Sequence, residues 1–185
     1  MSPAYPVDLD SDVVLRDGLT LRLRPVRSDE APAVLELFQQ LSEQSLYYRF
    51  MTVPKLDLSR AREIVDIDYD TQFVLDAERG GTLAGSAGYY RDPTRPGRAE
   101  VAFAVADAVQ GRGLGTRLLE RLAEVARDRG VRAFDAFVLG GNRRMMDVFL
   151  QSGFAVTQAL EQGVFHVALS LDRTAAFTEA AAQRS

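Results

Sequence analysis

The stretch from 109 to 116, Val-Gln-Gly-Arg-Gly-Leu-Gly-Thr, contains the residue types that bind phosphate. It lies between an apolar run at 100–105, typical of a strand, and an amphipathic helix expected from about 114 to 129. Its three glycines let the backbone approach a ligand closely, and the helix start directs unpaired N–H groups at the loop. Arg112 adds a guanidinium suited to phosphate. The stretch therefore predicts an anion-binding turn, with a turn that binds nothing as the alternative.

Two common phosphate-binding motifs do not fit this stretch. A P-loop needs a lysine after its last glycine, and none follows here. The dinucleotide fingerprint needs Gly-x-Gly-x-x-Gly, whereas this chain has Gly-x-Gly-x-Gly deep in the sequence. The pattern that does match is Gln-x-x-Gly-x-Gly, with Gln110, Gly113 and Gly115 at its defining positions.

This pattern resembles the pyrophosphate loop of the GCN5-related N-acetyltransferases (GNAT), and the helix from Asn142 towards Gly153 and Phe154 resembles their second signature. The resemblance implies acetyl-CoA as co-substrate and no metal. It also implies a bulge-splayed gap between the family's fourth and fifth strands that receives the pantetheine arm. The cofactor-binding residues expected from it are Phe103, Ala104, Val105, Gln110, Gly111, Arg112, Gly113, Leu114, Gly115, Thr116, Asn142 and Phe149.

A narrower resemblance concerns the acceptor. Segments 46–50, 68–70 and 99–103 are similar to Pat-type protein lysine acetyltransferases. Segments 13–18 and 171–177 are similar to the acetyltransferase module fused to ADP-forming acyl-CoA synthetases, so the chain is either a standalone relative or a piece of a fusion. The implied partner is an acceptor lysine of a protein such as an acyl-CoA synthetase.

Acetyl transfer to lysine needs a proton acceptor. A lysine pKa of about 10.4 means that freeing the amine near neutral pH costs roughly 4–5 kcal/mol. A positioned carboxylate can remove that proton. Glu100 opens the strand before the loop and matches the general base of Pat-type enzymes, so it is the expected catalytic residue. The alternative is an edge glutamate in solvent.

The leaving thiolate has no assigned acid. Many relatives carry a tyrosine where this chain has Phe149, which cannot donate a proton. The thiolate would leave unassisted, or take a proton from water, Tyr89 or Tyr90. A thiol pKa near 8.5 makes it a tolerable leaving group.

The acceptor side has weaker signals, each with a structural alternative. The expected substrate-binding residues are Tyr47, Tyr48 and Arg49, which could equally be packing and one surface charge. A group of acidic residues between 57 and 70 would attract a cationic lysine substrate, or it could simply be a charged surface exposed to solvent. The group comprises Asp57, Glu63, Asp66, Asp68 and Asp70. Acetylation of a small amine and a non-catalytic acyl-CoA sensor remain alternative functions.

Composition narrows the remaining classes. The chain has 185 residues, 46% apolar content, a net charge of −4 and no cysteine. The charge argues against a nucleic-acid binder. With no cysteine and only His166, thiol catalysis and a Cys or His metal cluster are excluded. No signal peptide and no apolar run near 18 residues are seen, so we expect a cytoplasmic protein with no membrane partner.

Hydrophobic periodicity and turn residues predict the elements. The first helix is expected to begin at a Ser28–Glu30 cap. The other helices are expected at 59–66, 114–129 and 142–151, and strands at 20–26, 72–77, 83–90, 100–106, 133–138, 153–157 and 164–171. This order is that of the GNAT fold, an α/β (α+β) architecture with a mixed, mostly antiparallel sheet of six to seven strands and helices on both faces. Expected boundaries are a flexible lead-in at 1–12, the acetyltransferase domain at 13–171 and a helical tail at 172–185.

Overall fold

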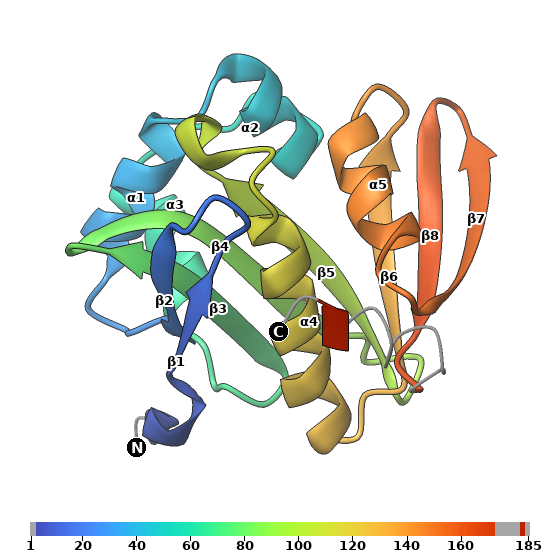
Figure 1. The fold of residues 1–185 in the computed structure, drawn as a ribbon, viewed down its shortest axis with the longest axis horizontal. Helices are drawn as coiled ribbons and strands as arrows, with labels where there is room; N and C mark the ends of the chain where they lie inside the picture. Colours follow the sequence, from blue (N-terminus) through green and yellow to red (C-terminus); the bar gives the residue numbers. More distant parts are fainter. Residues whose placement is uncertain (1–2, 173–181, 184–185) are drawn as a thin grey trace.

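One mixed sheet organises the computed structural model, which describes residues 3–172 and 182–183. Its eight strands follow the order β1-β2-β3-β4-β5-β6-β8-β7, and only β5 and β6 pair in parallel (Figure 1). The predicted class is confirmed, and the strand count is larger than predicted. The strands are β1 (Ser11–Val14), β2 (Thr20–Pro25), β3 (Gln72–Arg79), β4 (Thr82–Arg91), β5 (Arg98–Val105), β6 (Ala133–Leu139), β7 (Ala155–Glu161) and β8 (Val164–Ser170).

The additional strand is β1, which pairs with β2 and begins at Ser11, inside the segment expected to be a flexible lead-in. A 3-10 helix, η1 (Val7–Leu9), precedes it. Four residues are too short for a clear alternating pattern, which is why the sequence did not reveal this strand. The predicted tail at 172–185 lies, apart from 172 and 182–183, outside the described residues.

Helices cover both faces of the sheet, as predicted. In Figure 1, α4 and α5 lie in front of the sheet, and α1 and α3 lie behind it. The helix α2 was not predicted: it has no fully buried residue, so its apolar periodicity is weak. The bounds are α1 (Ala31–Gln39), α2 (Glu43–Phe50), α3 (Leu58–Val65), η2 (Asp107–Val109), α4 (Leu114–Asp128) and α5 (Arg143–Leu150).

The predicted side-chain cap of α1 is wrong. Glu30 occupies the N-cap position, but its side chain makes no cap hydrogen bond. Its carboxylate instead accepts bonds from the guanidinium of buried Arg24, at 2.9 Å from Nη1, and from the backbone N–H of Arg27, at 2.8 Å. A buried guanidinium needs an ionic partner, so it takes the carboxylate that the helix start would otherwise use.

The sheet opens between β5 and β6. Their parallel pairing covers only Arg98–Glu100 with Ala133–Asp135. From Val101 to Val105 the β6-facing edge of β5 has no paired strand, while the other edge stays paired with β4. The β4–β5 register runs without a shift, so the expected bulge is not what separates the strands here. The described elements thus form the gap that the resemblance predicts, one strand later in this numbering.

Helix α4 packs directly against β4, and this fixes its first turn beside the gap. A Cβ at Gly85 of β4 would lie 3.1 Å from the Leu114 side chain and 3.2 Å from the carbonyl oxygen of Ala104. Leu118 and Leu122 continue the buried face of α4. A side chain at 85 would crowd both of these neighbours, so the glycine favours this close approach.

A polar row crosses the sheet next to the gap. Arg24 of β2, Asp76 of β3 and Ser86 of β4 are successive register partners, and Ala104 of β5 pairs with Ser86. Asp76 is fully buried, and neither carboxylate oxygen has a hydrogen-bond partner within the described residues. Burial raises the pKa of Asp76 to about 7, although the Ser86 hydroxyl and the Arg24 charge pull it down.

We expect Asp76→Asn to change how the free energy of unfolding depends on pH. Because the native pKa lies above the unfolded value of about 3.9, the unfolded chain loses this proton first, and wild-type stability falls as pH rises from about 4 to 7. The variant lacks this loss, so it should match wild type near pH 4 and exceed it by about 2–4 kcal/mol near pH 8.

Urea unfolding across this pH range measures the effect. Asp29→Asn, at an exposed position before α1, is the control and should follow wild type. The same pH slope in wild type and Asp76→Asn would contradict the prediction.

Candidate active site

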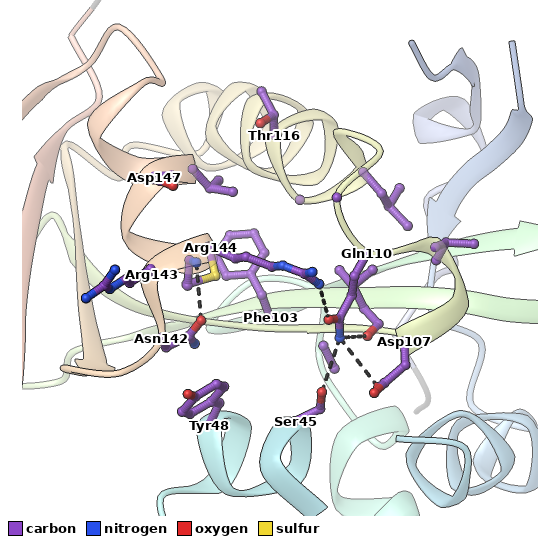
Figure 2. Close-up of a pocket in the computed structure, with 18 of the residues that line it drawn as sticks. Ser45, Tyr48, Phe103, Asp107, Gln110, Thr116, Asn142, Arg143, Arg144 and Asp147 are labelled. Atoms are coloured by element: carbon purple, nitrogen blue, oxygen red, sulfur yellow. Dashed lines mark hydrogen bonds between the residues drawn. The ribbon is translucent and has the colours of Figure 1, made fainter. Parts of the chain in front are cut away.

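A cleft of about 760 Å³ lies where β5 leaves β6 (Figure 2). Its walls come from β5, α2, the β1–β2 turn, the loop before α4, the first turn of α4, and α5. Most of the residues expected from the sequence line it: Tyr48, Arg49, Phe103, Ala104, Val105, Gln110, Gly111, Gly113, Leu114, Gly115, Thr116 and Asn142. The structure therefore brings together residues that lie up to 94 positions apart, from 48 to 142.

The start of α4 is arranged to bind an anion. Gly113 occupies the N-cap with a φ of 92°, and no side chain caps the helix. The first helical bond runs from the N–H of Arg117 to the carbonyl of Gly113, so the N–H groups of 114–116 have no acceptor within the helix. Those three residues line the cleft, where the helix dipole also favours negative charge.

Gln110 ties the loop to the elements around the cleft. Its amide nitrogen donates to the carbonyl of Val105 at 3.0 Å and to the hydroxyl of Ser45 at 3.2 Å. Its amide oxygen accepts from Nη1 of Arg144 at 2.8 Å. Figure 2 shows Arg144 reaching across the cleft to make this bond. One carboxamide thus joins β5, α2 and α5, which holds the loop in place.

The opposite wall closes through a tight contact. A Cβ at Gly141 would lie 3.2 Å from the Tyr48 hydroxyl, so the Tyr48 side chain of α2 reaches the loop between β6 and α5. Asn142 caps α5 by accepting the N–H of Met145 at 3.3 Å. Its side chain is therefore used to begin the helix, and it also lines the cleft.

The cleft carries more positive charge than the sequence suggested. Four arginines and two aspartates line it: Arg16, Arg49, Arg143, Arg144, Asp107 and Asp147. The motifs do not identify Arg16, Arg143 or Arg144 as site residues. Arg16 lies in segment 13–18, whose resemblance assigns it no role, and Arg143 and Arg144 occupy no defining position. Only the adjacency of 143 and 144 to Asn142 could have pointed to the latter two.

Four of the expected site residues do not line the cleft. Arg112 is exposed and pairs with Asp17, with Nε to Oδ2 at 3.1 Å. Phe149 is buried and packs edge-on against Phe103, with ring centroids 5.8 Å apart. Tyr47 and Glu100 are both exposed, outside the lining.

Glu100 is nevertheless connected to the cleft through Arg49. Tyr90 and Glu100 are cross-strand partners on β4 and β5, so their side chains share a face. Desolvation lowers the pKa of the half-buried Arg49, while the Tyr90 hydroxyl and the Glu100 charge act to raise it. The guanidinium that lines the cleft therefore lies within electrostatic reach of both.

The two tyrosines named for the leaving group are in different environments. Tyr89 is fully buried and stacks with Phe73, with centroids 5.7 Å apart, and burial raises its pKa. Tyr90 lies on the opposite face of β4, the face that carries Glu100. Two of the acidic residues predicted to favour a cationic acceptor have local roles. Asp57 caps α3, and Asp68 accepts backbone N–H groups of the turn that follows it.

No group of three or more His, Asp or Glu side chains in 3–172 and 182–183 could hold a metal ion. None of the helices in this part of the chain is both long and apolar enough to cross a membrane.

We expect Gly113→Ala and Gly115→Ala to change stability in opposite directions. The φ of 92° at Gly113 strains any Cβ, which would also lie 3.3 Å from Arg16 Nε, so alanine should lower the free energy of unfolding by about 1–2 kcal/mol. Gly115 lies within α4, and its Cβ would meet only Val148 at 3.4 Å, so alanine should raise stability by up to about 1 kcal/mol. Urea unfolding measures both, and equal destabilisation by the two would contradict the assigned conformations.

Comparison with known proteins agrees with this geometry. Residues 35–154 match the acetyltransferase (GNAT) family. The chain is 34% identical over 140 residues to "Acetyltransferase Pat" of Mycolicibacterium smegmatis, covering 73% of this chain and 42% of that protein. The GNAT domain of S. lividans PAT superposes with a TM-score of 0.83 at 37% identity, covering 90% of this chain and 99% of that one.

A longer solved protein shares the same fold. The cAMP-binding acyltransferase from Mycobacterium smegmatis gives a TM-score of 0.64 at 27% identity, covering 89% of this chain and 48% of that chain. The present chain thus spans less than half the length of these two mycobacterial proteins. Because the family match covers more than half of the sequence and the S. lividans domain superposes over 90% of the chain, this protein belongs to the acetyltransferase (GNAT) family of enzymes.

Proposed function

We propose that this protein transfers the acetyl group of acetyl-CoA directly to a lysine side chain of another protein, with Glu100 as general base. The observation that carries the proposal is the separation of β5 and β6 immediately after Glu100, which leaves a cleft beside an unpaired strand edge. The similarity to the two Pat proteins supports a protein acceptor. The cytoplasmic location expected from the sequence is part of the same proposal.

The residues of the cleft fit a phosphate-bearing thioester. Its four arginines outnumber its two aspartates, and the uncapped start of α4 adds backbone donors. In this proposal the N–H groups of 113–116 and the arginines hold the pyrophosphate. Acetyl-CoA supplies the activated acetyl group when bound. The cleft walls are held in place by Gln110, Asn142 and Phe149. Arg112 lies outside the cleft, where it pairs with Asp17.

The unpaired edge of β5 can polarise the carbonyl of the acetyl group. Successive residues of a strand direct their backbone groups to alternate edges, so part of the N–H groups in 103–105 point into the gap. Backbone donors at such a position stabilise the negative charge that develops on a carbonyl oxygen during acyl transfer. The Val105 carbonyl is already occupied by Gln110, which keeps this segment of the edge in place.

Glu100 receives the proton of the acceptor in this proposal. The lysine ammonium loses one H⁺ to the carboxylate, and its nitrogen bonds to the acetyl carbon. The carbon–sulfur bond breaks with the electron pair going to sulfur, and the second proton that the nitrogen loses passes to the thiolate or to water. At about 3.3 Å per strand residue, Glu100 lies roughly 10 Å along β5 from Phe103. That separation leaves room for a lysine side chain between the base and the cleft, beside Tyr48 and Arg49.

We expect Glu100→Gln to lower kcat by roughly 10²–10³-fold and to leave acetyl-CoA affinity unchanged, because the carboxylate removes a proton and does not line the cleft. The residual rate should rise about tenfold per pH unit, as the free lysine loses its own proton in solution. Release of CoA thiol measures the rate, and calorimetry measures binding. Glu36→Gln, on the exposed side of α1, is the matched control.

The acceptor is tested separately. Mass spectrometry of candidate proteins, acyl-CoA synthetases among them, should find lysine acetylation with wild type and not with Glu100→Gln. A panel of small amines assayed in parallel decides between acceptor classes. Faster turnover of a small amine than of every protein would overturn the protein acceptor, and CoA binding without any transfer would indicate a sensor.

A further inference from the structure

The turn between β1 and β2 lies against the phosphate loop, although it is far from the loop in sequence. It is a defined turn: the N–H of Leu15 donates to the carbonyl of Leu19 at 2.8 Å, and Gly18 has a φ of 83°. Leu15 is buried and anchors the turn in the core. Residues 16 and 17, at its tip, are exposed and contact the loop, Arg16 beside Gly113 and Asp17 at Arg112.

Asp17 engages the arginine that the sequence pattern favours for phosphate. Its Oδ2 lies 3.1 Å from Nε of Arg112. Arg112 does not line the cleft and instead borders a shallow depression with Asp17 and Arg79. An ion pair with a carboxylate offsets the charge that Arg112 could offer to a phosphate group.

Arg16, and not Arg112, is the arginine that lies beside the N-cap residue Gly113. Its Nε and Nη2 lie 3.3 and 3.5 Å from the point where a Cβ at Gly113 would stand, directly over the N-cap of α4. It lines the cleft, and it has no carboxylate partner within residues 3–172. A guanidinium presents two parallel N–H donors, which match two oxygens of one phosphate.

We propose that Arg16 is a phosphate-binding residue of the cofactor site, and that the Asp17–Arg112 pair holds the β1–β2 turn so that Arg16 lies over the uncapped start of α4. The proposal rests on the proposed use of acetyl-CoA. The phosphate is either the pyrophosphate or the 3′-phosphate of CoA, since both are dianionic groups with the same donor requirement.

The test is calorimetric titration of CoA into wild type, Arg16→Ala, Arg16→Gln, Arg79→Ala and Arg112→Ala. We expect Arg16→Ala and Arg16→Gln to raise the Kd for CoA about tenfold, the lower end for a lost charge-assisted contact. Arg79→Ala removes the same charge from an exposed site outside the cleft, so its Kd should change less than about twofold. Arg112→Ala removes the ion-pair partner of Asp17 that holds the turn, so its Kd should lie between those of Arg79→Ala and Arg16→Ala; a Kd equal to that of Arg79→Ala would overturn the positioning role of the Asp17–Arg112 pair. Thermal unfolding of each variant confirms that it is folded.

The outcomes separate this inference from the function on which it rests. No binding of CoA by wild type would remove the proposed function. Binding by wild type with equal Kd values for Arg16→Ala, Arg16→Gln and Arg79→Ala would overturn the role of Arg16 alone. Repeating the titration with 3′-dephospho-CoA identifies the group: a penalty that persists assigns Arg16 to the pyrophosphate, and one that disappears assigns it to the 3′-phosphate.

Discussion

The parting of two parallel strands is the constraint on which the rest of this structure depends. β5 and β6 share three register pairs and then diverge, while β4 remains paired along the other edge of β5. Backbone N–H and C=O groups buried without partners are costly, so a sheet interior opens only where something else can satisfy them. Here the amide of Gln110 takes the carbonyl of Val105, and the remaining edge faces the cleft. The opening in the sheet and the cleft are therefore the same feature.

The loop and the central elements could be predicted because their signals are local. Glycine at 111 and 113 takes positive φ, and the apolar face of α4 repeats with helical spacing, so neighbouring residues alone reveal both. The helix α2 and the strand β1 escape such analysis, since one lacks a buried face and the other has four residues. Yet α2 supplies Tyr48 and Arg49 to the cleft wall, so the missed elements belong to the site as well as to the scaffold.

The charges of the site depend on contacts that a sequence does not display. Counting residues gives a net charge of −4, whereas the cleft collects four arginines from the β1–β2 turn, α2 and α5. Arg112 has the right residue type at the right place in the motif, but Asp17 engages it. In the same way, Glu30 is the N-cap residue of α1, but its carboxylate accepts a hydrogen bond from Arg24 and does not cap the helix. In each case a tertiary ion pair reassigns a residue whose local role looked clear. For Glu30 the reason is burial, because the buried guanidinium of Arg24 needs an ionic partner more strongly than a helix start does.

The position of Phe149 bears on how the thiolate leaves. Its ring is buried against Phe103, which forms part of the cleft wall, so this residue shapes the wall and has no proton to give. Tyr89 is enclosed in the core, where burial raises its pKa and separates it from the cleft, which leaves Tyr90 as the tyrosine that shares a face with Glu100. A thiol with a pKa near 8.5 departs as thiolate with little penalty near neutral pH, whereas an attacking lysine carries a proton that must first be removed. The arrangement is therefore consistent with the proposed function: the proposed base is a carboxylate, Glu100, and the wall near Phe149 is apolar, where many relatives place an acid.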